Sequence, residues 1–204
     1  MKQMWNERYA AEEYAYGKAP NAFFKQFLDT YQPRGNILLP AEGEGRNAVY
    51  AAKIGLSVFA FDISEEGKKK ALALAQREKV NIDYQVLDMS DIALKDNEYD
   101  AVALVFAHFP SSHLHVYHRK IAKTVKPGGF ICLEAFALGH EEFQRSNPKA
   151  GGPKDIDMLF TIELIKRDFP EFTPLLLEEC EVKLLEGKFH DGKSKVLRFI
   201  GKKT

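Results

Sequence analysis

The apolar residues of this chain fall into short continuous runs, and most of these runs are separated by longer segments of helical period. Apolar runs bounded by turn residues indicate strands buried on both faces, whereas apolar positions three or four apart indicate helices. This alternation predicts a parallel sheet with right-handed helical crossovers. The expected strands are 37–39, 57–62, 82–87, 101–106 and 130–136, and the expected helices are 46–54, 64–78 and 111–125.

The two ends of the chain depart from this alternation. Ala137–Asp157 is rich in glycine and proline, and we expect it to be an exposed loop. The other terminal elements expected are helices 4–14, 22–30 and 161–168, then extended runs 175–184 and 195–202 paired as a hairpin. The fold class predicted is α/β: a Rossmann-like, seven-stranded, mostly parallel sheet with helices on both faces and a C-terminal antiparallel β-hairpin.

Composition narrows the classes of partner. The chain has 29 basic and 29 acidic side chains and no charge block, which argues against a nucleic-acid partner. It has no apolar run long enough for a membrane span and no signal-peptide pattern at its start. Cys132 and Cys180 lie in strand-like runs without metal-site or redox spacing, so we expect reduced thiols and a cytoplasmic protein. The sequence carries no signal for an oligomeric state.

The segment Asn36–Asn47, NILLPAEGEGRN, is the most informative stretch. It reads as a strand, a glycine turn and the start of a helix, and the next strand ends in Asp62. In a parallel sheet this unit binds a nucleoside cofactor at the carboxyl ends of the strands. Gly43 and Gly45 allow close approach of the backbone to a ligand, and the carboxylate of Asp62 can accept both ribose hydroxyls.

Two nucleoside cofactors fit this loop. Gly43–Ala48 satisfies the dinucleotide pattern G-x-G-x-x-G/A, which leaves an NAD(P)-dependent oxidoreductase open. A second acid, Asp88, follows the third strand and can contact an adenine amino group. Neither the Lys126–Gly129 turn nor the terminal hairpin has a role in a simple dinucleotide fold. These features favour S-adenosylmethionine (AdoMet).

Together they resemble the class I AdoMet-dependent methyltransferases over nearly the whole chain. The Gly43–Asn47 loop, Trp5, Tyr9 and His108 look most like the small tellurite-resistance and thiopurine-type enzymes. The resemblance implies strand order 3-2-1-4-5-7-6, with the loop on the methionine moiety, Asp62 on the ribose and the region after strand 3 on the adenine. The cofactor-binding residues expected are Ala41, Glu42, Gly43, Gly45, Asp62, Ile63, Asp88, Met89 and Phe106.

The loop departs from the family pattern in two places. The family usually has Asp two residues before a first glycine, where this chain has Leu39 and Ala41. Ala41 keeps a compact turn if its φ is negative. Glu42 or Glu44 can replace the missing acid as the anchor of the cofactor's ammonium group.

Candidate substrate-side and catalytic groups lie around the same edge. His108, after the fourth strand, is the candidate catalytic base, with a structural histidine as the equal alternative. Tyr14, Tyr16 and Trp5 form either a lid or a core contact, and Glu134 and His140 lie beside the expected substrate opening. We expect His190 to be a solvated turn residue. His113, His115 and His118 are expected to be solvated or helix-packing, and no metal set is found.

We therefore predict an enzyme that transfers a methyl group from AdoMet to a small molecule. The alternatives are an NAD(P)-dependent oxidoreductase and a non-catalytic nucleoside-binding module. One methyltransferase domain is expected over residues 1–204, with an N-terminal helical lid region (1–34), a cofactor-binding core (35–136) and a substrate-side loop with the hairpin (137–204).

Overall fold

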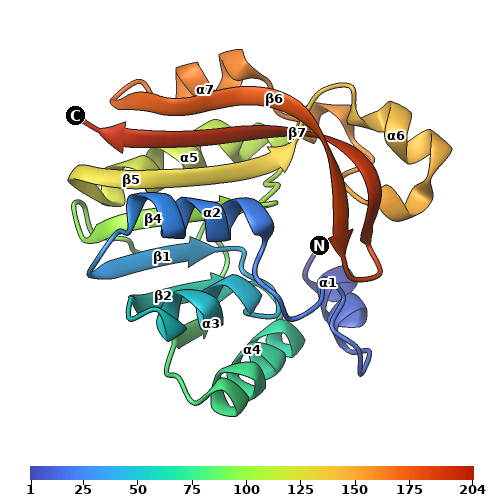
Figure 1. The fold of residues 1–204 in the computed structure, drawn as a ribbon, viewed down its shortest axis with the longest axis horizontal. Coiled ribbons are helices and arrows are strands. Elements are labelled where there is room, and N and C mark those ends of the chain that lie inside the picture. The colour runs from blue at the N-terminus through green and yellow to red at the C-terminus, as the bar shows by residue number, and fades with distance from the viewer.

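The computed structural model describes residues 1–204 and contains a seven-stranded sheet in the order β3-β2-β1-β4-β5-β7-β6 (Figure 1). β1 to β5 are parallel, and β7 runs antiparallel between β5 and β6. The predicted fold class and strand order are confirmed. The strands are β1 (Asn36–Pro40), β2 (Ser57–Asp62), β3 (Asp83–Val86), β4 (Tyr99–Val105), β5 (Val125–Phe136), β6 (Phe172–Glu186) and β7 (His190–Lys203).

Seven α-helices and two short 3₁₀ turns accompany the sheet. α2, α3 and α4 supply the core on one face, and α5 and α7 supply it on the other. The helices are α1 (Lys2–Tyr9), α2 (Ala22–Tyr31), α3 (Arg46–Lys53), α4 (Glu65–Glu78), α5 (Ser111–Thr124), α6 (His140–Ser146) and α7 (Ile162–Asp168), and the turns are η1 (Pro148–Ala150) and η2 (Ile156–Met158). None of these helices combines the length and apolarity needed to cross a membrane.

The position of β1 at the centre of the sheet explains why its sequence is apolar without alternation. Ile37 and Leu39 pack into the core beneath α2 and α3, while Leu38 packs into the core beneath α5. All three side chains are fully buried. Burial of each contributes about 1.5–3 kcal/mol, so this strand fixes the position of the loop that follows it.

The turn Lys126–Gly129 is part of β5 instead of preceding it. Tyr99 pairs with Val125 and Ala101 pairs with Phe130, so the four turn residues are inserted between two registers of the ladder. α5 ends at Thr124, before this insertion. The proline and glycines of this turn thus mark an irregularity in the pairing of β4 with β5.

The prediction that Ala137–Asp157 is an exposed loop is wrong. The segment contains α6, η1 and part of η2, and Ala137, His140 and Ala150 are buried. Gly139 precedes α6 with φ +96°, and Gly151 follows η1 with φ +75°. These two glycines therefore mark the start of one short helix and the end of another. A single sequence does not distinguish such short helices from a continuous loop.

The C-terminal hairpin is longer than predicted and extends beyond the sheet. Its strands remain paired as far as Glu186 and His190, and in Figure 1 the far end curls toward α1. The N–H of Lys188 at its tip donates to the carbonyl of Ala15 (3.0 Å). α1 ends at Tyr9 instead of Tyr14, so residues 10–21 run as a strap between α1 and α2 and meet the hairpin tip.

Candidate functional site

The loop between β1 and α3 has a left-handed backbone at three positions. The φ angles are +53° at Ala41, +62° at Gly43 and +83° at Gly45. The expectation of a negative φ at Ala41 is wrong, because the turn is tight enough to force the left-handed region. For alanine this conformation costs about 1–2 kcal/mol. The loop therefore keeps its shape at a local energetic cost.

Both glutamates of the loop are buried, and they point to different neighbours. Oε1 of Glu42 accepts the N–H groups of Asn47 and Ala48 (2.8 Å each), which caps the first turn of α3. Oε2 of Glu44 instead accepts the N–H of Ala15 in the strap (2.8 Å). Burial raises the pKa of Glu42 to about 7, although these hydrogen bonds favour the ionised form. Glu42 is the acid that lies at the helix N-terminus, and Glu44 ties the loop to the strap.

Asp62 at the end of β2 joins the loop to α4. Its Oδ2 accepts the N–H of Gly43 (3.0 Å), and its Oδ1 accepts the N–H of Ser64 (2.9 Å). Each oxygen retains a lone pair, so the carboxylate fits a ribose diol. Burial raises its pKa to about 6. Ser64 caps α4 by accepting the N–H of Gly67 (3.0 Å).

Two tyrosines enclose Gly43. The hydroxyl of Tyr84 donates to its carbonyl (2.6 Å), and a Cβ on Gly43 would lie 2.6 Å from the hydroxyl of Tyr9. The ring of Trp5 stacks on Tyr9 with centroids 5.4 Å apart. Only glycine fits this cradle, and α1 covers it. The donor and acceptor set of the loop, of Asp62 and of this cradle fits a nucleoside cofactor.

The residues expected to frame the adenine are less closely gathered. Asp88 is exposed, and its Oδ1 accepts the N–H and hydroxyl of Ser90 (2.8 Å each), which lowers its pKa. Met89 is buried in the core with Phe61, and Ile63 is half-buried. The adenine contacts assigned to these residues stay predictions.

The two strap tyrosines point in different directions. The hydroxyl of Tyr14 donates to the carbonyl of Lys70 on α4 (3.0 Å). The ring of Tyr16 lies 4.5 Å from that of His190, and its hydroxyl accepts from Arg8 (2.8 Å). Tyr16 therefore contacts the hairpin at the carboxyl edge, while Tyr14 anchors the strap to α4.

His108 is half-buried and His140 is buried, and the backbone satisfies the hydrogen bonds of both rings. Nδ1 of His108 donates to the carbonyl of Met158 (2.9 Å), and its Nε2 accepts the N–H of Phe136 (3.2 Å). Burial lowers the pKa of His108 to about 4. Nε2 of His140 donates to a backbone carbonyl (3.0 Å), and its Nδ1 accepts the N–H of Lys195 (3.2 Å). Neither ring keeps a free lone pair, so this geometry does not favour His108 as a base.

Phe106 and Glu134 lie at the ends of β4 and β5. Phe106 has φ +52°, and its N–H donates to the carbonyl of Glu134 (2.7 Å). The carboxylate of Glu134 accepts from Arg198 (2.8 Å) and from the amide of Asn21 (2.6 Å). These contacts connect both strands to the hairpin and to the start of α2.

The expectation that His190 is solvated is wrong. It is 5% exposed, and Nδ1 lies 3.4 Å from Oε2 of Glu186. Glu186 also accepts from Arg46 (2.8 Å) and from Asn21 (2.9 Å). This pair was missed because the curl of the hairpin is not encoded in local periodicity. The sequence signal that could have indicated this pair is a run of charged residues at the tip of a long strand pair.

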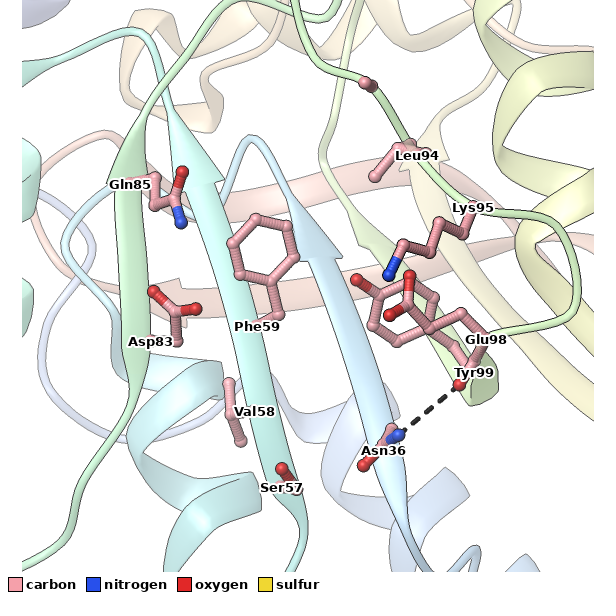
Figure 2. Close-up of a pocket in the computed structure, with 11 residues that line it drawn as sticks. Asn36, Ser57, Val58, Phe59, Asp83, Gln85, Leu94, Lys95, Glu98 and Tyr99 are labelled. Atoms are coloured by element: carbon pink, nitrogen blue, oxygen red, sulfur yellow. Dashed lines mark hydrogen bonds between the residues drawn. The ribbon is translucent and has the colours of Figure 1, made fainter.

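The site has a hollow beside this ionic cluster. A cavity of about 290 Å³ lies between the strap and the hairpin, and its walls include Asn21, Arg46, Glu134, Glu186 and Arg198. A larger and more open hollow of about 380 Å³ lies on the amino-terminal halves of β1, β2 and β3 (Figure 2). Figure 2 shows Lys95, Glu98 and Tyr99 on one side of it and Asp83 and Gln85 on the other. It is remote from the glycine loop, so the smaller cavity is the one relevant to the cofactor edge.

Comparison with known proteins gives a family match over part of the chain. Residues 37–129 match a family described as a methyltransferase domain. No curated protein matches the chain in sequence. A structure from a study of the conversion of a disulfide bond into a thioacetal group during echinomycin biosynthesis superimposes with a TM-score of 0.80 at 16% identity, covering 100% of this chain and 91% of that one.

Two further structures share the fold. TehB from Haemophilus influenzae has a TM-score of 0.73 at 16% identity, covering 100% of this chain and 67% of that one. The 1,6-didemethyltoxoflavin-N1-methyltransferase of Burkholderia thailandensis, solved with 1,6-didemethyltoxoflavin and S-adenosylhomocysteine, has a TM-score of 0.63 at 18% identity, covering 89% and 76%. The resemblance of this chain to the class I methyltransferases is confirmed at the level of the fold.

Proposed function

We propose that this chain, which carries a methyltransferase domain on the class I fold, transfers a methyl group from AdoMet to a small-molecule acceptor. The observation that carries the proposal is the bond between Asp62 and Gly43. It ties the acid after β2 to the glycine loop and still leaves an acceptor lone pair on each carboxylate oxygen. When bound, AdoMet supplies an electrophilic sulfonium methyl group and leaves a neutral thioether.

The residues proposed to hold the cofactor divide by its parts. Asp62 would bind the ribose, and the backbone of Gly43 and Gly45 would approach the methionine moiety. Glu42 occupies the N-terminus of α3, where its carboxylate can neutralise an ammonium group. α1 and the strap would exclude water, so positioning of the reactants would contribute to the rate.

A small acceptor is supported by the size of the cavity between the strap and the hairpin, about 290 Å³. The balanced charge of the chain gives no support to a polyanionic acceptor. A cytoplasmic setting is supported by the two unpaired thiols, Cys132 and Cys180.

Calorimetric titration with AdoMet, S-adenosylhomocysteine and NADH tests the cofactor. We expect heat from the first two and none from NADH, and tight NADH binding alone would overturn the assignment. Transfer of a radiolabelled methyl group to a panel of small thiols, amines, phenols and metalloid oxyanions tests the reaction. Cofactor binding with no transfer to any acceptor would favour the nucleoside-binding module.

A further inference from the structure

Three histidines surround one aromatic ring at the carboxyl end of β5, and two of them, His140 and His190, are buried. The ring centroids of His108, His140 and His190 lie 5.7, 4.1 and 5.1 Å from that of Phe136. Their hydrogen bonds separate them. His108 and His140 each donate to a backbone carbonyl and accept a backbone N–H, so both tautomers are fixed and both lone pairs are used.

His190 differs because its only hydrogen-bond partner is a carboxylate. An ionised carboxylate can only accept, so Nδ1 carries a proton, and in the neutral ring Nε2 carries the lone pair. Nε2 makes no hydrogen bond within the protein. The only enclosed side-chain polar atoms without a partner are His118 Nε2 and Ser194 Oγ, so Nε2 of His190 retains access to solvent. It is the one free imidazole acceptor in this group of three.

The partner of His190 is held in place from the cofactor loop. Oε2 of Glu186 accepts from the guanidinium of Arg46, the first residue of α3, and Oε1 accepts from Asn21 at the start of α2. Charge-assisted bonds of this kind are the stronger ones and fix geometry. The hydrogen bond with His190 and the charge of Arg46 hold the pKa of Glu186 at about 2, despite its burial. Glu186 therefore stays ionised and orients the imidazole.

The surroundings of His190 place it at the edge where cofactor and acceptor would meet. Its ring lies 4.5 Å from that of Phe106, which follows β4, and 4.5 Å from that of Tyr16 in the strap. Burial lowers the pKa of His190, Glu186 opposes that effect, and Arg46 and Arg8 add to it. Burial also lowers the pKa of the neighbouring His108, to about 4. A neutral ring with a free lone pair is the form a general base requires.

We propose that Nε2 of His190 is the proton acceptor for methyl transfer, with Glu186 as the positioning residue, and that the acceptor arrives with its nucleophilic N, O or S protonated. This rests on the proposed function. The lone pair of the acceptor atom forms the bond to the methyl carbon, and the C–S electron pair departs with sulfur. The acceptor's proton passes to Nε2, and the resulting imidazolium is neutralised by Glu186 and later releases the proton to water.

The tautomer is tested without knowledge of the acceptor. In ¹⁵N-histidine spectra of the S-adenosylhomocysteine complex, His190→Gln assigns the signals of residue 190. We expect a neutral ring at pH 7 with the proton on Nδ1. A proton on Nε2, or a charged ring at pH 7, would overturn the proposal. This measurement decides the proposal even where no probe acceptor is methylated.

Phenol and thiophenol provide matched kinetic probes, because thiophenol ionises readily and phenol does not. His190→Gln should lower phenol methylation about 10²–10⁴-fold, leave thiophenol methylation within about threefold and preserve S-adenosylhomocysteine affinity. Glu186→Gln should lower phenol methylation about tenfold and move the pKa of His190 further down. His113→Gln, on the exposed side of α5, is the control.

The two proposals fail in different ways. Loss of both probe reactions to the same extent in His190→Gln, or no loss of either, contradicts a base at residue 190. Absence of S-adenosylhomocysteine binding by the unaltered protein contradicts the proposed function itself.

Discussion

At the scale of single residues, the carboxylate of Asp62 has two tasks. It holds the N–H groups of Gly43 and Ser64, and it is the proposed ligand of the ribose. The first task preorganises the second, because the loop is fixed before any ligand arrives. Asp62 is also the residue that sequence analysis could name most directly, since it ends a strand at a fixed distance from the glycine turn.

Replacing Asp62 by alanine removes the proposed ribose contacts, each worth about 1.5–3 kcal/mol at most. We expect the affinity for S-adenosylhomocysteine to fall at least tenfold, with the circular dichroism spectrum unchanged. Asp91→Ala, at an exposed acid on the same edge, is the control for calorimetry. An unchanged dissociation constant in a folded Asp62→Ala protein would move the ribose site elsewhere.

Glu42 makes a second residue-scale prediction, about pH. Its pKa is raised from 4.5 to about 7, so its contribution to stability is complete below pH 4.5 and is lost as pH rises through 7. Glutamine keeps an acceptor oxygen without the buried charge. Glu42→Gln should therefore match the natural protein near pH 4.5 and be about 1–3 kcal/mol more stable at pH 8. Urea unfolding at both pH values measures this, and a less stable variant at pH 8 would contradict it.

At the scale of elements, the hairpin tip and the strap form one contact that depends on a glycine. A Cβ on Gly187 would lie 2.5 Å from the carbonyl oxygen of Ala15 and 2.8 Å from the backbone nitrogen of Gly17. Backbone atoms do not yield easily, so alanine here must lift the tip away from the strap. The tip is thus sensitive to a single methyl group.

Gly187→Ala should increase hydrogen exchange at residues 15–17 and 186–190, with exchange in β1 and β4 unchanged. Gly55→Ala is the matched control, because Gly55 also has a positive φ (+95°) but nothing within 4 Å of an added Cβ. Both variants bear the backbone strain, and only the first bears the clash. Equal protection patterns in the two would show that the tip does not depend on this contact.

Most elements were predictable from local pattern, and the failures have a common cause. α3, α4 and α5 follow apolar periodicity, α4 also begins at its capping serine, and β1, β2 and β4 follow apolar runs. The misassigned parts are α6 and the curled hairpin, where the deciding contacts come from residues far away in sequence. Glu186 and Arg46 are 140 positions apart, a relation that no window of periodicity contains.

At the scale of the whole molecule, the sheet divides the core into two layers that meet at β1. Leu38 packs in the layer formed with α5 and α7 and is fully buried. Leu38→Ala should cost about 2–5 kcal/mol of unfolding free energy, because the site has helices and sheet on all sides and cannot collapse around the cavity. Leu72→Ala, at a side chain 40% exposed on α4, should cost well under 1 kcal/mol in the same denaturation experiment.

The contact of Glu186 with Asn21 and Arg46 also has a consequence for how the protein is made. Asn21 and Arg46 leave the ribosome well before Glu186, their common partner, which follows Arg46 by 140 positions. The early strands can pair and the glycine loop can form while the rest is still being synthesised. The proposed proton acceptor cannot be oriented until β6 and β7 emerge. The proposed base is then acquired after the nucleoside site, and a chain synthesised only as far as β5 would bind the nucleoside without being able to use it.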